Sequence, residues 1–112
     1  PAEWREWLRF TPTASYDDPW ADACRSVILV DLPSWPSAHR PHAWRQPGFV
    51  APTLDLNVAF HRHAGDQDWL LCDGAAPVST DGLFGWTARV WSAGGRLHAS
   101  GGLSRRVQPP PG

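Results

Sequence analysis

The sequence predicts an α+β fold in which one helix packs against an antiparallel sheet. Two patterns support this: a single segment near the N-terminus has helical periodicity, and most of the second half alternates apolar and polar residues as strands do. In addition, short glycine-containing turns separate the alternating segments, which is typical of consecutive antiparallel strands. With 112 residues, the chain is long enough for one compact domain and not for two.

The helix is predicted to run from Pro19 to about Leu32, after a loosely alternating strand over residues 3–10. Asp18 can cap the free N–H groups of the first turn, and Pro19 suits the first helical position. Pro33 cannot continue the helix. The i, i+3, i+4, i+7 spacing predicts a helix face made of Trp20, Ala23, Cys24, Val27, Ile28 and Asp31. Because a buried carboxylate needs partners, we expect Asp31 to accept hydrogen bonds at the helix end or from a strand.

Residues 34–48 lack periodicity and predict an irregular loop, and four strands follow it. The first, residues 53–61, alternates strictly. One side carries Leu54, Leu56, Val58 and Phe60, and the other carries Thr53, Asp55, Asn57, Ala59 and His61.

The last three strands are predicted from residue 69 toward 78, over 84–91 and over 96–107, with hairpin turns at 81–82 and 94–95. In the third of the four strands, Phe84, Trp86, Ala88 and Val90 form the apolar face. Gly101 and Gly102, in the middle of the last strand, indicate a bulge or the close approach of another backbone or a ligand.

The composition excludes several classes of function. A net charge of −1 gives no electrostatic case for nucleic acid or an anionic membrane as the main partner. No apolar run approaches the roughly 20 residues that span a bilayer, so we expect no membrane span and a cytoplasmic location. Cys24 and Cys72 lie in apolar segments without zinc or redox spacing, which predicts two buried free thiols. We expect no cofactor and no metal, since His39 and His42 also lack ligand spacing.

The chain contains no methionine. It opens on Pro1 and closes on a Gln-Pro-Pro-Pro-Gly tail of linker-like composition. We therefore expect a processed or partial piece of a longer protein, with one domain over residues 1–107 and a disordered tail over 108–112.

Four segments together resemble the C-terminal half of the type II acyl-CoA thioesterases. Residues 54–62, LDLNVAFHR, are similar to the family's LDHxxxFHR strand, and residues 68–71, DWLL, to its EWLL strand start. Residues 82–84, GLF, match the arm of the family's hairpin, and residues 94–100, GGRLHAS, resemble its closing DGRLVAS. The resemblance extends over about residues 4–107, and the order and spacing of the segments make it specific.

This resemblance implies a hotdog fold, in which an antiparallel sheet wraps around one central helix. It also implies a double hotdog, in which two such halves pack side by side, sheet edge to sheet edge. The expected partners are an acyl-CoA substrate and either another hotdog half or a second copy of the chain.

The family hydrolyses acyl-CoA with an Asp, a Ser or Thr, and a Gln that orient and activate water. The Asp falls on Asp55. The hydroxyl falls in the stretch 75–80, strictly at Pro77, with Ser79 and Thr80 beside it. The candidate substitutes for the missing family residues are Ser79, Thr80, Ser100 and Ser104. The Gln falls at Leu103 or Ser104, so this sequence departs from the family pattern there.

Several functional interpretations stay open. Arg105 and Arg106 are candidates to bind the phosphates of CoA, with Gly101 and Gly102 beside them, although a solvated strand end explains the arginines equally well. A dehydratase-like pair of Asp55 and His61 is an alternative, but residues six apart on a strand lie about 20 Å apart. The alternative to an enzyme is a non-catalytic hotdog domain that binds an acyl group or completes a dimer.

Overall fold

The computed structural model describes residues 2–34, 52–63 and 67–106. Its elements follow the predicted order and are β1 (Glu3–Leu8), α1 (Pro19–Asp31), β2 (Thr53–Phe60), β3 (Leu70–Thr80), β4 (Leu83–Trp91) and β5 (Leu97–Arg106). The predicted loop, except for Ser34, and the predicted tail lie outside the described residues, as do His39 and His42.

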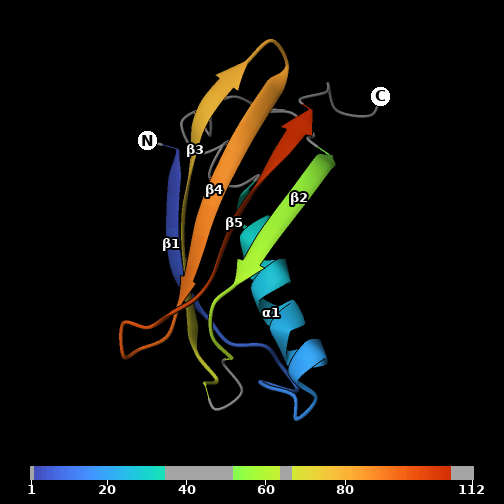
Figure 1. The fold of residues 1–112 in the computed structure, drawn as a ribbon. Coiled ribbons are helices and arrows are strands. Elements are labelled where there is room, and N and C mark those ends of the chain that lie inside the picture. The colour runs from blue at the N-terminus through green and yellow to red at the C-terminus, as the bar shows by residue number, and fades with distance from the viewer. Residues whose placement is uncertain (1, 35–51, 64–66, 107–112) are drawn as a thin grey trace.

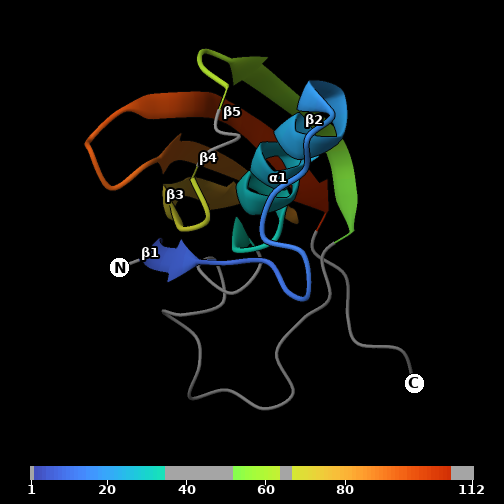
Figure 2. The same ribbon diagram turned by 90° about the horizontal axis from the view of Figure 1, so that it is seen from below.

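The five strands form one antiparallel sheet in the order β1-β3-β4-β5-β2, so β1 and β2 are its edges. The sheet curves around α1, which lies along its inner face (Figures 1 and 2). Both predicted hairpin turns are present, and Asp81, Gly82 and Gly95 adopt positive φ angles there. The predicted α+β class, one helix held by an antiparallel sheet, is therefore confirmed.

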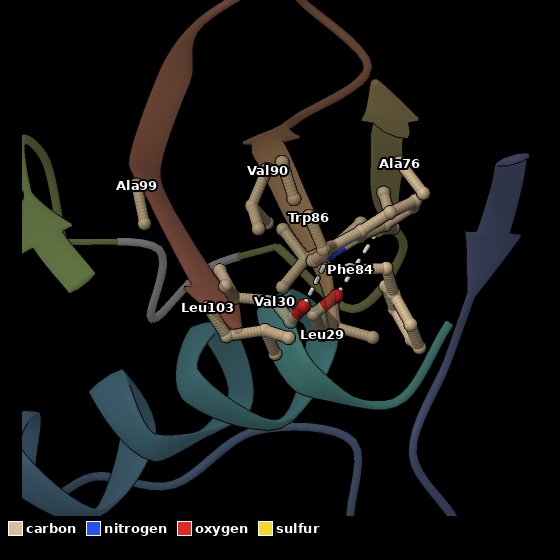
Figure 3. Close-up of a cluster of buried hydrophobic side chains, with 11 residues drawn as sticks. Leu29, Val30, Ala76, Phe84, Trp86, Val90, Ala99 and Leu103 are labelled. Atoms are coloured by element: carbon tan, nitrogen blue, oxygen red, sulfur yellow. Dashed lines mark hydrogen bonds between the residues drawn. The ribbon is translucent and has the colours of Figure 1, made fainter. Parts of the chain in front are cut away.

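The core lies between α1 and the inner face of the sheet (Figure 3). The predicted inner face of β4 is confirmed, because its four apolar side chains are buried: Phe84, Trp86, Ala88 and Val90. The Trp86 indole donates a hydrogen bond to the Val30 carbonyl at 2.6 Å, and the Cys72 thiol donates to the Leu29 carbonyl at 3.0 Å. Carbonyls in the last turn of a helix have no partner within it, so these side chains satisfy the helix end from the sheet.

The predicted buried face of α1 is wrong. Trp20 is 82% exposed, Ile28 is 45% exposed, and Cys24, predicted to be buried, is exposed as well. The face toward the core instead consists of Asp22, Arg25, Ser26, Leu29 and Val30.

The physical reason is a buried ion pair near the start of α1. Arg25 Nε lies 2.9 Å from Asp22 Oδ1, and Arg25 Nη2 donates a hydrogen bond of 3.0 Å to Asp22 Oδ2. The Tyr16 amide donates to the same carboxylate, and the Arg25 guanidinium donates to the carbonyls of Ala14 and Gln67. Two charges that partner each other can occupy a buried face that a hydrophobic pattern assigns to solvent.

The pairing of β2 with β5 contains an irregularity that reverses one predicted side chain. Thr53 pairs with Arg105 and Asp55 with Ser104, which leaves Leu54 as an extra residue. Thr53 therefore faces α1, where its hydroxyl donates to Asp31 Oδ1 at 2.9 Å, and not the side of Asp55 as strict alternation predicts. Arg105 also binds this Asp31 oxygen at 3.0 Å, so the expected hydrogen bonding of Asp31 is confirmed.

Candidate active site

Asp55 lies on the exposed edge strand β2, with its side chain on the sheet surface away from α1. Its Oδ1 accepts a hydrogen bond of 3.0 Å from the backbone N–H of Ser104, its register partner on β5. The hydrogen bond fixes the carboxylate beside β5. Asp55 itself stays exposed to solvent, so a carboxylate is held in place and accessible.

The two predicted hydroxyl residues lie on another part of the sheet. Asp55, Ser104, Gly85 and Val78 form one row across β2, β5, β4 and β3. Three strand spacings separate the ends of this row, which places Val78 about 14 Å from Asp55. Ser79 and Thr80 follow Val78 on β3, so the structure does not bring them together with Asp55 within one domain.

The two candidate positions for the family Gln differ sharply. Leu103 is only 5% exposed and belongs to the core cluster on the side of α1. Ser104 is its neighbour on the opposite side of β5, in register with Asp55. Pro77, at the family's hydroxyl position, is exposed on β3 where its pairing with β4 is irregular. Ser104 is therefore the hydroxyl-bearing residue directly beside Asp55.

The predicted substrate-binding residues have structural contacts. The Arg105 guanidinium donates to the Ser34 hydroxyl at 2.8 Å and to Asp31, whereas Arg106 is exposed at the strand end. A Cβ on Gly101 would collide with the Asn57 carbonyl of β2, and one on Gly102 would lie 2.8 Å from the Trp86 carbonyl. The sequence predicted a bulge or the close approach of another backbone or a ligand at these two glycines. The structure shows the close approach of another backbone.

A cavity of about 370 Å³, here called the α1–β2 cavity, lies at the other end of β2 from Asp55. It is lined by Pro19, Trp20, Asp22, Ala23, Ser26, Phe60, His61, Arg62 and His63. The rings of Trp20 and Phe60 and the methyl group of Ala23 provide an apolar surface there. Asp22 and His63 add polar groups, and their nearest side-chain atoms lie 4.0 Å apart. The hydrophobic spacing of α1 did not predict this cavity. Three of its lining residues, 60–62, nevertheless belong to the LDLNVAFHR segment that carries part of the family resemblance.

His61 connects two of the segments that carry the resemblance. Its Nε2 lies 2.8 Å from the Ser100 hydroxyl in the GGRLHAS segment, and its backbone N–H donates to the His98 carbonyl at 2.8 Å. The imidazole therefore pairs with a serine on the neighbouring strand and not with Asp55.

The part of the chain that the structure describes contains no group of three or more His, Cys, Asp or Glu residues placed to hold a metal ion. Among residues 2–34, 52–63 and 67–106, no helix is long and apolar enough to cross a membrane.

Comparisons with known proteins define the class. The fold superimposes on an acyl-CoA thioesterase II, TesB2, from Mycobacterium marinum with a TM-score of 0.83 and 25% identity, covering 96% of this chain. TesB from Mycobacterium avium subsp. paratuberculosis gives 0.82 at 20% identity and 96% coverage. A Streptococcus mutans protein bound to acetyl-CoA gives 0.77 at 16% identity, covering 96% of this chain and 82% of that one. The fold is the hotdog fold of thioesterase structures, as predicted.

The chain belongs to the family described as the acyl-CoA thioesterase C-terminal domain, whose model matches residues 1–101. It spans 42% of the length of each of the two mycobacterial proteins. A search of curated proteins found no significant match.

Proposed function

We propose that this domain hydrolyses acyl-CoA thioesters to a free acid and CoA, with Asp55 activating the water. The observation that carries the proposal is the exposed Asp55 carboxylate, fixed by the Ser104 N–H, on the strand that matches the family motif. The Streptococcus mutans structure, bound to acetyl-CoA, supports a CoA thioester as ligand of this fold.

In the proposed reaction the Asp55 carboxylate takes a proton from water while the water oxygen attacks the thioester carbon. The carbon–sulfur bond then breaks, and CoA leaves as a thiolate that takes up the proton. We assign the hydroxyl that orients this water to Ser104, because residues in register on neighbouring strands have Cβ atoms about 5 Å apart. Ser79 and Thr80 would contribute only from another hotdog unit.

A second hotdog unit completes the proposed site. Large exposed apolar side chains cluster on α1 and β2, and we call them the α1–β2 apolar surface: Trp20, Ile28, Leu32, Leu54, Leu56 and Phe60. The free edge of β2 beside them can pair with another strand.

Pairing of two β2 edges also accounts for the distance between Asp55 and the α1–β2 cavity within one unit. Asp55 and the α1–β2 cavity lie at opposite ends of β2, about 17 Å apart along the strand. Antiparallel pairing of two such edges would bring the end of β2 that carries Asp55 in one unit next to the end of β2 that borders the cavity in the other. The partner unit is another hotdog half or a second copy of this chain.

The two free thiols, Cys24 and Cys72, fit a reducing compartment, and we place the protein in the cytoplasm as part of this proposal.

The test is release of CoA from a panel of acyl-CoA substrates of increasing chain length, with Asp55→Ala as the comparison. We expect hydrolysis of at least one chain length by the wild type and its loss in the variant. Undiminished hydrolysis by Asp55→Ala would refute the assignment of Asp55.

The second candidate is a non-catalytic hotdog domain that binds an acyl group or completes a dimer. The burial of Leu103, one of the two positions where the family Gln falls, favours it. Acyl-CoA binding by the wild type without release of CoA, for every chain length, would establish this alternative.

A further inference from the structure

A second hollow, about 550 Å³ in volume, lies next to the α1–β2 cavity where the β4–β5 turn meets the segment after β2. We call it the basic pocket, and its principal lining residues are Arg62, His63, Ser92, Gly94, Arg96 and His98. Arginine and histidine make up most of this lining, and none of the described residues that line it is acidic; the nearest carboxylate to His63 is that of Asp22, at 4.0 Å. Arg62 and His63 line both spaces, so the two adjoin across these side chains.

The arginines of the basic pocket, like Arg9 and Arg106, differ from the ion-paired arginines of the domain. Four other arginines each bind an aspartate: Arg5, Arg25, Arg89 and Arg105. Within the described ranges, Arg62 and Arg96 form no ion pair with a carboxylate. Both guanidinium groups therefore belong to the lining of the hollow and are not paired with a described carboxylate.

The backbone around the basic pocket is held by hydrogen bonds. The Arg62 N–H donates to the His98 carbonyl at 3.2 Å, and the Ser92 N–H donates to the Arg96 carbonyl at 3.0 Å. Gln67, which also lines the hollow, is anchored through its carbonyl by the buried Arg25 guanidinium at 2.6 Å. The chain segments that carry the two arginines are thus fixed before any ligand binds.

We propose that the basic pocket binds a phosphate group and, on the strength of the proposed function, that it holds the phosphates of CoA. Guanidinium groups match phosphate oxygens with two parallel N–H donors, and such charge-assisted hydrogen bonds are the strong ones. The Ser92 hydroxyl and the His63 imidazole supply further donors. A Cβ at Gly94 would meet no heavy atom within 4 Å, so the turn leaves room for a bulky ligand.

The location suits one ligand with two chemically different ends. The α1–β2 cavity offers an apolar surface for an acyl or pantetheine segment, and the basic pocket offers cations directly beside it. This assignment differs from one to Arg105, whose guanidinium is already bound by Asp31 and Ser34.

The test compares binding of CoA, of pantetheine, which lacks phosphate, and of inorganic phosphate by calorimetry. The variant is Arg62→Gln with Arg96→Gln, and the matched control is Arg9→Gln, an exposed arginine that does not line either space. We expect the Kd for CoA to rise about tenfold for each lost guanidinium contact. Binding of pantetheine by the variant, and of CoA by the control, stays unchanged.

The outcomes separate this proposal from the proposed function. Equal CoA affinity in the wild type and the double variant overturns the basic pocket, even in a protein that hydrolyses acyl-CoA. Arginine-dependent CoA binding without hydrolysis supports the pocket while the enzymatic function fails. Arginine-dependent binding of inorganic phosphate without binding of CoA overturns the assignment to CoA and leaves a site for free phosphate.

Discussion

At the scale of single residues, polar side chains in the interior of this domain are matched to specific partners. Asp22 and Arg25 neutralise each other, and the Trp86 indole and the Cys72 thiol satisfy carbonyls at the end of α1. Asp55 is different, because it accepts a backbone hydrogen bond and yet remains exposed. That combination of fixed position and access to solvent distinguishes it from the buried carboxylate.

The two thiols are predicted to differ in reactivity. Burial raises the pKa of the Cys72 thiol to about 12, and the charges of Asp73 and Glu6 add to the rise. Cys24 is exposed. A thiol reagent should therefore modify Cys24 alone in the folded protein and both thiols in urea. Modification of Cys72 in a folded Cys24→Ser variant would contradict this account.

The same shift predicts a pH dependence of stability. Above pH 9.0, the ordinary pKa of the thiol, unfolded Cys72 loses its proton while folded Cys72 keeps it until about pH 12. The folded state then binds more protons, so the free energy of unfolding falls as pH rises through this window. Urea titrations should show a steeper fall for the wild type than for Cys72→Ala, and equal slopes would contradict the prediction.

The buried ion pair predicts unequal costs for two aspartates near the start of α1. Asp22→Ala leaves Arg25 buried without its counter-charge, which should lower the free energy of unfolding by about 3–5 kcal/mol. Asp18→Ala removes only the helix cap, a hydrogen bond of 2.9 Å to the Trp20 N–H, and should cost about 1 kcal/mol. Urea unfolding of both variants measures the difference, and equal losses would contradict it.

At the scale of elements, the order of strands and helix could be predicted because alternation and turn residues are local properties of the sequence. The cap at Asp18 and the hairpin at Asp81 and Gly82 are likewise local, and both are confirmed. The buried face of α1 could not be predicted, since it depends on an ion pair that forms only when distant segments meet. The extra residue at Leu54 also depends on pairing with β5, so the register of Thr53 could not be predicted.

The same distinction applies to the candidate site. Asp55 could be identified from its motif, whereas its contact with Ser104 required the register of two strands 49 residues apart. The basic pocket combines Arg62, which follows β2, with Arg96, which precedes β5. No spacing in the sequence marks that pair, because only the fold brings the two segments together.

The close packing of β2 on β5 predicts a selective effect of added methyl groups. In Gly101→Ala the new Cβ meets the Asn57 carbonyl of β2, so the edge strand must shift. We expect a loss of about 1–3 kcal/mol in the free energy of unfolding. Gly85→Ala, also within a strand, meets nothing within 4 Å and should stay within about 0.5 kcal/mol of the wild type. A Gly101→Ala variant as stable as Gly85→Ala would contradict this packing.

At the scale of the whole molecule, the domain exposes a strand edge and large apolar side chains along α1 and β2. Figure 1 shows α1 beside β2, the edge strand to which Asp55 belongs, and the residues of the α1–β2 apolar surface come from these two elements. The matched mycobacterial proteins are more than twice as long as this chain, which covers 42% of each. A second hotdog unit on this side is the arrangement proposed above.

Association through this side predicts a distinct effect of charge on α1. Ile28→Glu places a carboxylate within the α1–β2 apolar surface and should weaken association of two units at least about tenfold. Val78→Glu changes a residue on β3 that is also exposed, at 57% against 45% for Ile28, and should leave association unchanged. Analytical ultracentrifugation of both variants measures this, and association of Ile28→Glu at the wild-type affinity would contradict the proposed interface.

The central claim is that the Asp55 carboxylate activates water, and the most direct measurement compares Asp55→Asn with the wild type in acyl-CoA hydrolysis. The amide oxygen of Asn can still accept the Ser104 hydrogen bond, so the urea midpoint should not change. It cannot take a proton from water, so kcat should fall about 100-fold or more. A stable Asp55→Asn variant with the wild-type kcat would contradict the account.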